Sequence, residues 1–563
     1  MSGGIDGSQV AGADHRAAQH PLPAESGRPA ESGRPKSSAQ LPPSAPPARF
    51  AAVFAVVTAG IAMVNLDLFI VNVALPSIGR TFGGADLASL SWVLNAYAIV
   101  FAALLVPAGR AADRIGRRTA FLAGVVVFAV ASAACAAAPG VWVLVVARIV
   151  QAAGGALLMP ASLGLLLAAA PPGKRTGAIR GWTSVGGAAA ALGPVLGGAL
   201  VAANWRWVFL VNVPVAAIAL AAGLRVLRSA TGQADNSKER AGADTARPDA
   251  IGAAIFTVAI GALALALVKA DAWGWGSARV LGLIAAAAVL IAGFARRSAR
   301  HPAPVIEPHL FRLPAFGTAT GANVVFGTAF GAMLLLVTLW CQDVWGWSAL
   351  RTGLAVAPGP LLVPFWAVGA GPLARRIGPG PVAAAGCVIY AAGCVFWRVN
   401  LSVEPDYVAH MLPGMLMTGT GVGLTLPTLV SAAVAAVPPH RFATGSGVVT
   451  MARQVGVVLG VAILVTVLGH QSGGAAVAAF QRATVVIAAI AAGAGLTALL
   501  LGRGARRPAT AAISQEGPVS DLAAGRRAAG PGPSSGASRS PGSGHRPLRR
   551  LRPRAAPPCA AIP

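Results

Sequence analysis

Long apolar runs recur along this chain from residue 50 to residue 502, and most charged side chains lie in the segments between and outside these runs. A helix needs about 20 mostly apolar residues to cross the hydrocarbon core of a bilayer. Charged residues make up only 11% of the chain, whereas soluble proteins contain about 25%. These features predict an all-α polytopic membrane protein, with the lipid bilayer as its main partner.

The apolar runs predict about fourteen membrane spans. They cover residues 50–74, 90–109, 119–138, 141–169, 178–202, 206–226, 249–269, 280–297, 316–341, 352–374, 379–398, 407–436, 445–468 and 480–502. Alternate loops are rich in lysine and arginine, and the opposite loops have few of these residues. Because basic residues collect in cytoplasmic loops, this alternation predicts an even number of spans with both termini in the cytoplasm.

Three polar segments lie outside the predicted spans. Residues 1–49 and 503–563 are rich in Pro, Gly, Ser and Ala, which predicts a disordered cytoplasmic N-terminal extension and a basic disordered cytoplasmic tail. Residues 227–248 predict a cytoplasmic loop. The tail arginines indicate either attraction to anionic lipid headgroups or only a solvated tail. Since the net charge of +26 resides in tails and short loops, we expect no nucleic-acid binding.

The sequence contains no pattern typical of a cofactor, metal or catalytic centre. Its five cysteines lack the paired spacing of metal sites. It also lacks the Gly-x-x-x-x-Gly-Lys-Ser/Thr loop that binds nucleotide phosphates. We therefore expect neither an enzyme nor an ATP-driven pump, and no cofactor or metal.

Residues 109–118 carry five charges between two apolar runs and predict a tight cytoplasmic turn. The candidate gating residues in this turn are Gly109, Asp113, Arg114, Gly116, Arg117 and Arg118. Residues 371–378 repeat the same glycine and Arg-Ile-Gly spacing, with Arg375 in place of Asp113. The repeat indicates two related halves, as in many secondary transporters; chance similarity is the alternative.

Asp67 lies deep in the first predicted span, with Asn72 just over one turn further along. A charge in a membrane helix costs about 2.5–3.5 kcal/mol, so such a residue indicates a functional site. A carboxyl group among apolar side chains can exchange protons near neutral pH. We interpret Asp67 as a proton carrier; a permanently paired structural carboxylate is the alternative.

Two arginines also lie inside predicted spans. Arg148, with Gln151 on the same helical face, could stabilise the charged form of Asp67 or instead snorkel to the outer surface. Arg453, followed by Gln454, either snorkels or lines a cavity in the second half.

The fifth predicted span is rich in small residues around a proline. Its motif residues are Gly193, Pro194, Gly197 and Gly198. Small residues let helices approach closely, and proline can bend a helix. Helix packing alone is the simpler interpretation of this motif.

Taken in order along the chain, these motifs resemble the major facilitator superfamily and, within it, the fourteen-span drug:proton antiporter family, over residues 50–502. The matching segments are 67–76 in the first span, 109–118 after the second, 148–151 in the fourth, 193–198 in the fifth and 205–214 at the start of the sixth. The segment in span five resembles the signature that separates exporters from importers.

The resemblance implies a major facilitator fold with an N-terminal six-helix half at 50–226, two additional central spans at 249–297 and a C-terminal six-helix half at 298–502. It implies proton-coupled export of small hydrophobic or cationic compounds, such as drugs and antibiotics, by alternating access. A multi-pass monomer in the plasma membrane would use the proton gradient. A proton-coupled importer or metabolite facilitator on the same fold is the alternative.

In the implied cycle, Asp67 carries the proton and Arg148 tunes its charge state. Asp113 and the neighbouring arginines latch the cytoplasmic side in the outward-facing state, and the bend at Gly193 and Pro194 lets span five rock.

Overall fold

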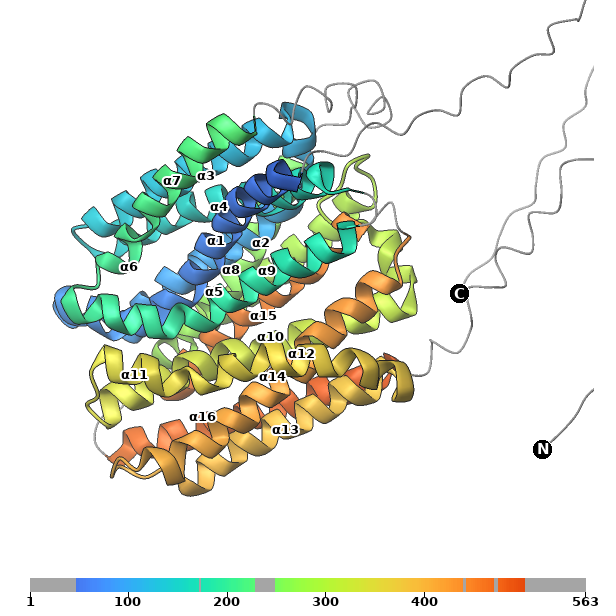
Figure 1. The fold of residues 1–563 in the computed structure, drawn as a ribbon. Helices are drawn as coiled ribbons and strands as arrows, with labels where there is room; N and C mark the ends of the chain where they lie inside the picture. The colour runs from blue at the N-terminus through green and yellow to red at the C-terminus, as the bar shows by residue number, and fades with distance from the viewer. Residues whose placement is uncertain (1–46, 172–173, 228–248, 439–441, 470–473, 502–563) are drawn as a thin grey trace, which may run out of the picture. The chain divides into compact units, whose positions relative to one another are not determined.

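The computed structural model describes residues 47–171, 174–227, 249–438, 442–469 and 474–501 (Figure 1). The predicted extension, loop and tail lie outside these residues except at their junctions. The first helix begins at Pro47, so residues 47–49, assigned to the extension, are helical. Within the described residues, fourteen helices are long and apolar enough to cross a membrane, which confirms the predicted number of spans.

The first half contains six spans. They are α1 (Pro47–Thr81), α2 (Leu87–Ile115), α3 (Arg117–Ala137), α4 (Val141–Ala169), α5 (Arg175–Ala203), and α6 with α7 (Trp207–Leu210 and Asn212–Val226). The second half contains α10 (Pro314–Leu339) with the π-helical turn η4 (Trp340–Val344), α11 with α12 (Ala349–Val356 and Pro358–Ile377), α13 (Pro379–Asn400), η5 with α14 (Tyr407–Met411 and Leu412–Ala435), α15 (Phe442–Leu468) and α16 (Gly474–Leu499).

The two halves repeat one packing scheme. In the first half α1 packs against α4, α5 and α7, and in the second half α10 packs against α14, α15 and α16. The pair α3–α4 corresponds to α13–α14, and the pair α2–α4 corresponds to α12–α14. Figure 1 shows α3, α4 and α7 toward one edge of the bundle and α13, α14 and α16 toward the opposite edge. The contacts therefore support the two related halves that the sequence repeat indicated.

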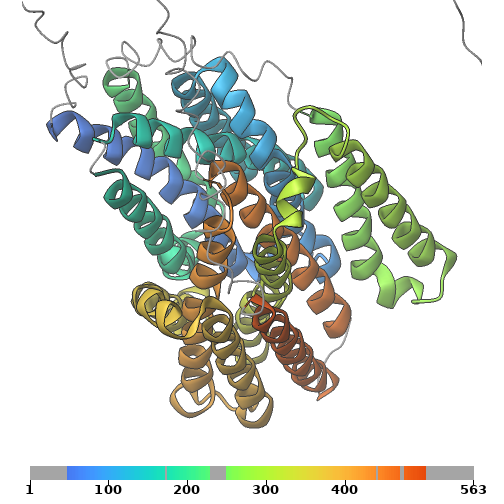
Figure 2. The same cartoon turned by 90° about the vertical axis from the view of Figure 1, so that its right-hand side faces the viewer.

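The two central spans, α8 (Ala250–Trp273) and α9 (Ala278–Ser298), form a hairpin beside the bundle (Figure 2). Asp249 joins the start of α8 to the end of α9. Its Oδ1 accepts hydrogen bonds from the backbone N–H of Gly252 and from Arg297 Nε, both at 2.7 Å. Helix α8 contacts α2 and α15, where the halves meet. The hairpin thus covers one seam between the halves.

The charged segment 109–118 is more helical than predicted. Helix α2 continues to Ile115 and α3 begins at Arg117, so the turn consists of Gly116 alone. Gly116 has a φ of +92°, a backbone conformation that residues other than glycine rarely adopt. Gly378 has a φ of +94° between α12 and α13, so both copies of the repeat use the same turn. The predicted ten-residue turn was wrong, since residues 109–115 continue helix α2. The end of this helix projects beyond the apolar span, where charged side chains such as Arg and Asp are tolerated in a helix.

Candidate functional site

A buried ion pair joins α1 and α4. The Asp67 carboxylate accepts a hydrogen bond from Arg148 Nη1, and the exposed fractions of the two side chains are 0% and 1%. Arg148 therefore points into the protein rather than toward the outer surface. Removing a charge from water costs several kcal/mol, so each ion depends on the other and on further hydrogen bonds.

Neutral side chains supply those hydrogen bonds. Gln151 accepts from Arg148 Nη1 at 2.6 Å, and its amide donates to Asp67 Oδ1 at 2.9 Å and to Ser132 Oγ at 2.8 Å. Asn212 Nδ2 donates to Asp67 Oδ1 at 3.3 Å. We call Asp67, Ser132, Arg148, Gln151 and Asn212, which come from α1, α3, α4 and α7, the Asp67 network.

Arg148 also connects this network to the centre of the protein. Its Nε donates to the carbonyl oxygen of Val93 at 3.2 Å. Its guanidinium carbon lies 3.9 Å from the centroid of the Tyr97 ring, a cation–π contact. Tyr97 on α2 and Arg148 on α4 both line a cavity. One arginine therefore contacts both the buried carboxylate and the cavity wall.

The cavity lies between the two halves and has a volume of about 50 Å³. Its lining residues are Leu68, Phe69, Asn72, Leu94, Tyr97, Ala98, Arg148, Phe330, Gly331, Leu334, Arg453, Gln454, Val457 and Val461. Pockets for drug-sized molecules occupy about 300–1,000 Å³. The cavity is thus too small for a drug-sized molecule in this structure, and such a molecule could enter only if the lining residues of the two halves move apart.

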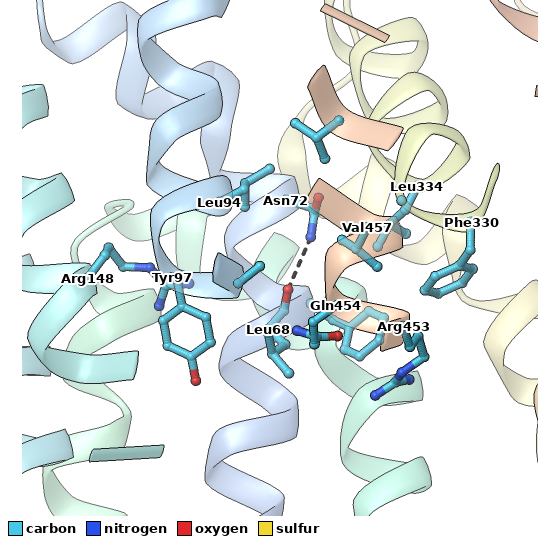
Figure 3. Close-up of a pocket in the computed structure, with 14 residues that line it drawn as sticks. Leu68, Asn72, Leu94, Tyr97, Arg148, Phe330, Leu334, Arg453, Gln454 and Val457 are labelled. Atoms are coloured by element: carbon cyan, nitrogen blue, oxygen red, sulfur yellow. Dashed lines mark hydrogen bonds between the residues drawn. The ribbon is translucent and has the colours of Figure 1, made fainter. Parts of the chain in front are cut away.

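The predicted polar residues divide between the network and the cavity. Asn72, Arg453 and Gln454 line the cavity, whereas Asp67 and Gln151 lie behind its wall. Figure 3 shows Arg148 and Tyr97 on one side of the cavity, with Phe330 and Arg453 on the other. Asn72 donates to the carbonyl oxygen of Leu68 at 3.2 Å within α1.

Close packing between α10 and α15 fixes the position of Arg453. A Cβ atom on Gly327 would lie 2.8 Å from the carbonyl oxygen of Arg453, and one on Gly331 would lie 2.7 Å from that of Val457. Because only glycine fits at these contacts, the rotation of α15 is set, and it places Arg453 at the cavity.

The glycine motif of α5 forms helix contacts instead of lining the cavity. A Cβ atom on Gly193 would lie 2.7 Å from Phe69 Cβ, and one on Gly197 would lie 3.0 Å from the carbonyl oxygen of Ile70. Phe69 itself lines the cavity. The motif therefore brings α5 against the part of α1 that carries the cavity wall.

The same motif also joins the two halves. A Cβ atom on Gly198 would lie 2.8 Å from Leu350 Cα on α11. On the α11 side, a Cβ atom on Gly353 would lie 2.9 Å from the carbonyl carbon of Pro194. Helices α5 and α11 thus meet backbone to backbone, at a contact that must change if the halves move.

This contact predicts that Gly353→Ala destabilises the protein, because the added methyl group meets backbone atoms that cannot move aside. We expect a loss of about 1–3 kcal/mol. Gly187→Ala on α5 is the matched control, since a Cβ atom there meets nothing within 4 Å. Thermal unfolding of the purified protein measures both. Equal unfolding temperatures for the two variants would show that the α5–α11 contact is not tight.

In the charged segment 109–118, Asp113 and Arg117 pair with each other across the turn between α2 and α3. Asp113 accepts from Arg117 Nε at 2.9 Å, and their side chains are 61% and 47% exposed. Arg117 also donates to the carbonyl oxygen of Gly164 on α4 at 3.3 Å. Arg114 is exposed and Arg118 is half-buried. Asp113 therefore ties the end of α2 to the start of α3.

A different residue of this segment reaches the start of the second half. Arg110 Nη1 donates to the carbonyl oxygen of Pro304 at 2.6 Å, and its Nη2 lies 3.5 Å from Glu307 Oε1. Both partners lie between α9 and α10. Arg110, which the sequence did not single out as a gating residue, thus spans the halves in this structure.

Sequence reasoning missed Ser132 and Asn212, which complete the Asp67 network, and Tyr97, which lies beside Arg148. Asn212 was visible as an amide inside an apolar run at the start of the sixth span. Serine is common in membrane helices, and the uncharged Tyr97 needs no ionic partner inside an apolar run, so neither residue could be assigned to this position from the sequence.

In the part of the chain that the structure describes, fourteen helices long and apolar enough to cross a membrane form two related halves around a central cavity, the build of many secondary transporters. The Major Facilitator Superfamily model matches residues 57–461 and 367–542. The chain belongs to the major facilitator superfamily, a family of transporters and not of enzymes.

Several relatives extend over most of the chain. The tetracenomycin C resistance and export protein of Streptomyces glaucescens is 34% identical over 74% of this chain and 76% of its own length. A multidrug resistance protein of Mycobacterium tuberculosis is 34% identical over 73% and 74%. The puromycin resistance protein of Streptomyces alboniger is 34% identical over 73% and 80%.

Solved structures show the same fold. A peptide transporter crystallised with sulfate aligns with a TM-score of 0.57 at 18% identity, over 81% of this chain and 96% of the other. A bacterial homologue of the human lysosomal transporter Spinster also aligns with a TM-score of 0.57, at 15% identity, over 82% and 98%.

Proposed function

We propose that this protein is a proton-coupled exporter of small, largely apolar compounds, including drugs or antibiotics. Relatives of this chain are named for tetracenomycin C resistance and export, for multidrug resistance and for puromycin resistance. The observation that carries the proton coupling is the ion pair of Asp67, which is buried behind the cavity wall, with Arg148, which lines the cavity. A plasma-membrane location and a monomeric transporter belong to the same proposal.

The ion pair suggests how a proton could change the shape of the cavity. In the charged state, Asp67 on α1 holds Arg148 on α4, and both helices border the cavity. Protonation of Asp67 would remove the charge that joins them. We propose that cargo loads from the cytoplasm while Asp67 is a paired carboxylate, and that release outside accompanies protonation of Asp67.

Cargo movement requires the contacts between the halves to exchange during alternating access. The contacts at issue are α2 with α15 and α5 with α11, together with the tie from Arg110 to the segment before α10. Since the cavity is smaller than a drug-sized molecule in this structure, opening on either side must separate one of these pairs.

The test is efflux from proteoliposomes under an imposed pH gradient, with a panel of dyes, antibiotics and metabolites. An exporter expels at least one compound toward the side that supplies protons. Accumulation of compounds along with the protons would instead identify the importer.

Asp113→Asn is expected to slow turnover several-fold and to leave cargo binding nearly unchanged. The Asp113–Arg117 pair is exposed, so its loss should change the free energy of unfolding by less than about 1 kcal/mol. Efflux rates and equilibrium binding by the purified variant measure the two effects separately. Unchanged efflux would remove Asp113 from the latch and leave Arg110 as the gating residue to examine.

A further inference from the structure

The cavity is lined by a second arginine, Arg453 of α15. Within the described part of the chain, the Arg453 guanidinium forms no hydrogen bond or ion pair. Arg148, the other lining arginine, is already compensated by Asp67. The uncompensated charge in the cavity therefore resides on Arg453.

Among the described residues that line the cavity, none is acidic. A cationic cargo would meet Arg453 with no carboxylate to compensate either charge. An anionic cargo would instead supply the missing partner, and charge-assisted hydrogen bonds to a guanidinium are among the strong ones. The sequence predicted hydrophobic or cationic cargo, and this lining disfavours the cationic class.

The surroundings of Arg453 fit one chemical class in particular. Gln454, the next residue, and Asn72, on α1 across the cavity, are amide side chains that can donate hydrogen bonds. Phe330, Leu334 and Val457 supply apolar surface beside them (Figure 3). A polar spot with one positive charge on an otherwise apolar wall suits a molecule with an apolar body and a single acidic group.

We propose that Arg453 binds the anionic group of the cargo, so that the exporter carries aromatic or aliphatic organic anions with a carboxylate or an ionised phenol. The proposal rests on the proposed function for its transport aspect, but binding to Arg453 is independent of proton coupling. It also fixes the charge movement. One proton entering while one anion leaves transfers two positive charges inward, whereas exchange for a monovalent cation transfers none.

Binding by the purified full-length protein, with no pH gradient, is the direct test. The probes are three fluorescent anthracenes of nearly equal size, which carry a carboxylate, a hydroxymethyl or an aminomethyl group on the central ring. We expect the carboxylate to bind best. Arg453→Gln should weaken carboxylate binding about tenfold and leave the hydroxymethyl probe unchanged.

Two further variants separate binding from structure. Arg453→Lys keeps the charge and should retain the preference for the carboxylate. Arg398→Gln removes an exposed arginine from α13, away from the cavity lining, and should change no affinity. Because Arg453 has no partner to lose among the described residues, Arg453→Gln should not lower the unfolding temperature, whereas replacement of a merely structural arginine would.

Carboxylate binding that is no tighter than hydroxymethyl binding, including the absence of measurable binding, would overturn the proposal. So would an unchanged carboxylate affinity in Arg453→Gln. Proteoliposome efflux of the carboxylate should in addition accelerate at inside-negative potential, and efflux insensitive to potential would contradict the charge movement. If the carboxylate binds through Arg453 but a pH gradient drives no efflux, the proposed function fails and the anion site stands.

Discussion

Asp67→Asn is expected to abolish pH-driven efflux while the protein remains folded in the membrane. Asp67 accepts from Arg148 through Oδ2 and from Gln151 and Asn212 through Oδ1. Asparagine has an NH₂ group in place of one of these oxygens, so it can neither accept both sets of hydrogen bonds nor carry a proton. We expect the pH-driven rate to fall about a hundredfold or more, which corresponds to a barrier higher by about 2.7 kcal/mol, because the amide has no proton to exchange.

Asp343→Asn provides the matched control for this prediction. It makes the same chemical change at an exposed position at the end of the ninth span, away from the cavity lining. Efflux should then keep its rate and pH dependence. If Asp67→Asn behaves like this control, Asp67 is a structural carboxylate and the proton is carried elsewhere.

Arg148→Gln should be the most destabilising of the substitutions considered. It leaves the Asp67 carboxylate fully buried without its cation, and breaking a buried pair costs about 3–5 kcal/mol. The reverse change, Asp67→Asn, should cost less, because Arg148 keeps its hydrogen bonds to Gln151 and to the carbonyl oxygen of Val93. Thermal unfolding of the purified variants measures this asymmetry.

The double variant Asp67→Asn with Arg148→Gln completes the cycle. With both charges removed, most of the stability lost in Arg148→Gln should return, because residues in one ion pair are not additive. Transport coupled to protons should remain absent. Destabilisation equal to the sum of the two single variants would show that the ion pair contributes little, and would contradict the buried pairing of Asp67 with Arg148.

Hydropathy predicted the fourteen spans because membrane helices must satisfy their own backbone hydrogen bonds, which makes their length and composition regular. It did not predict that α2 continues through the charged residues to Ile115. Beyond the bilayer, charged side chains no longer oppose helix formation, so the apolar pattern ends before the helix does.

The site could be predicted only in part. Asp67 and Arg148 could be identified because a charged side chain inside an apolar span is energetically costly and therefore indicates a functional site. Their partners Ser132 and Asn212 come from other helices, and tertiary packing alone brings them together. For Arg453, the sequence could not choose between the membrane surface and the cavity, because that choice depends on the rotation of α15, which contacts with glycines of α10 determine.

In the proposed mechanism, Asp67 links proton entry to cargo export. This link is tested by following both fluxes at once in proteoliposomes, with a pH-sensitive dye for protons and the compound of the panel that leaves fastest. We expect cargo efflux to be accompanied by proton influx in the wild type, and Asp67→Asn to remove both. Cargo efflux at an equal rate without a pH gradient, or without proton influx, would show that Asp67 does not couple the two.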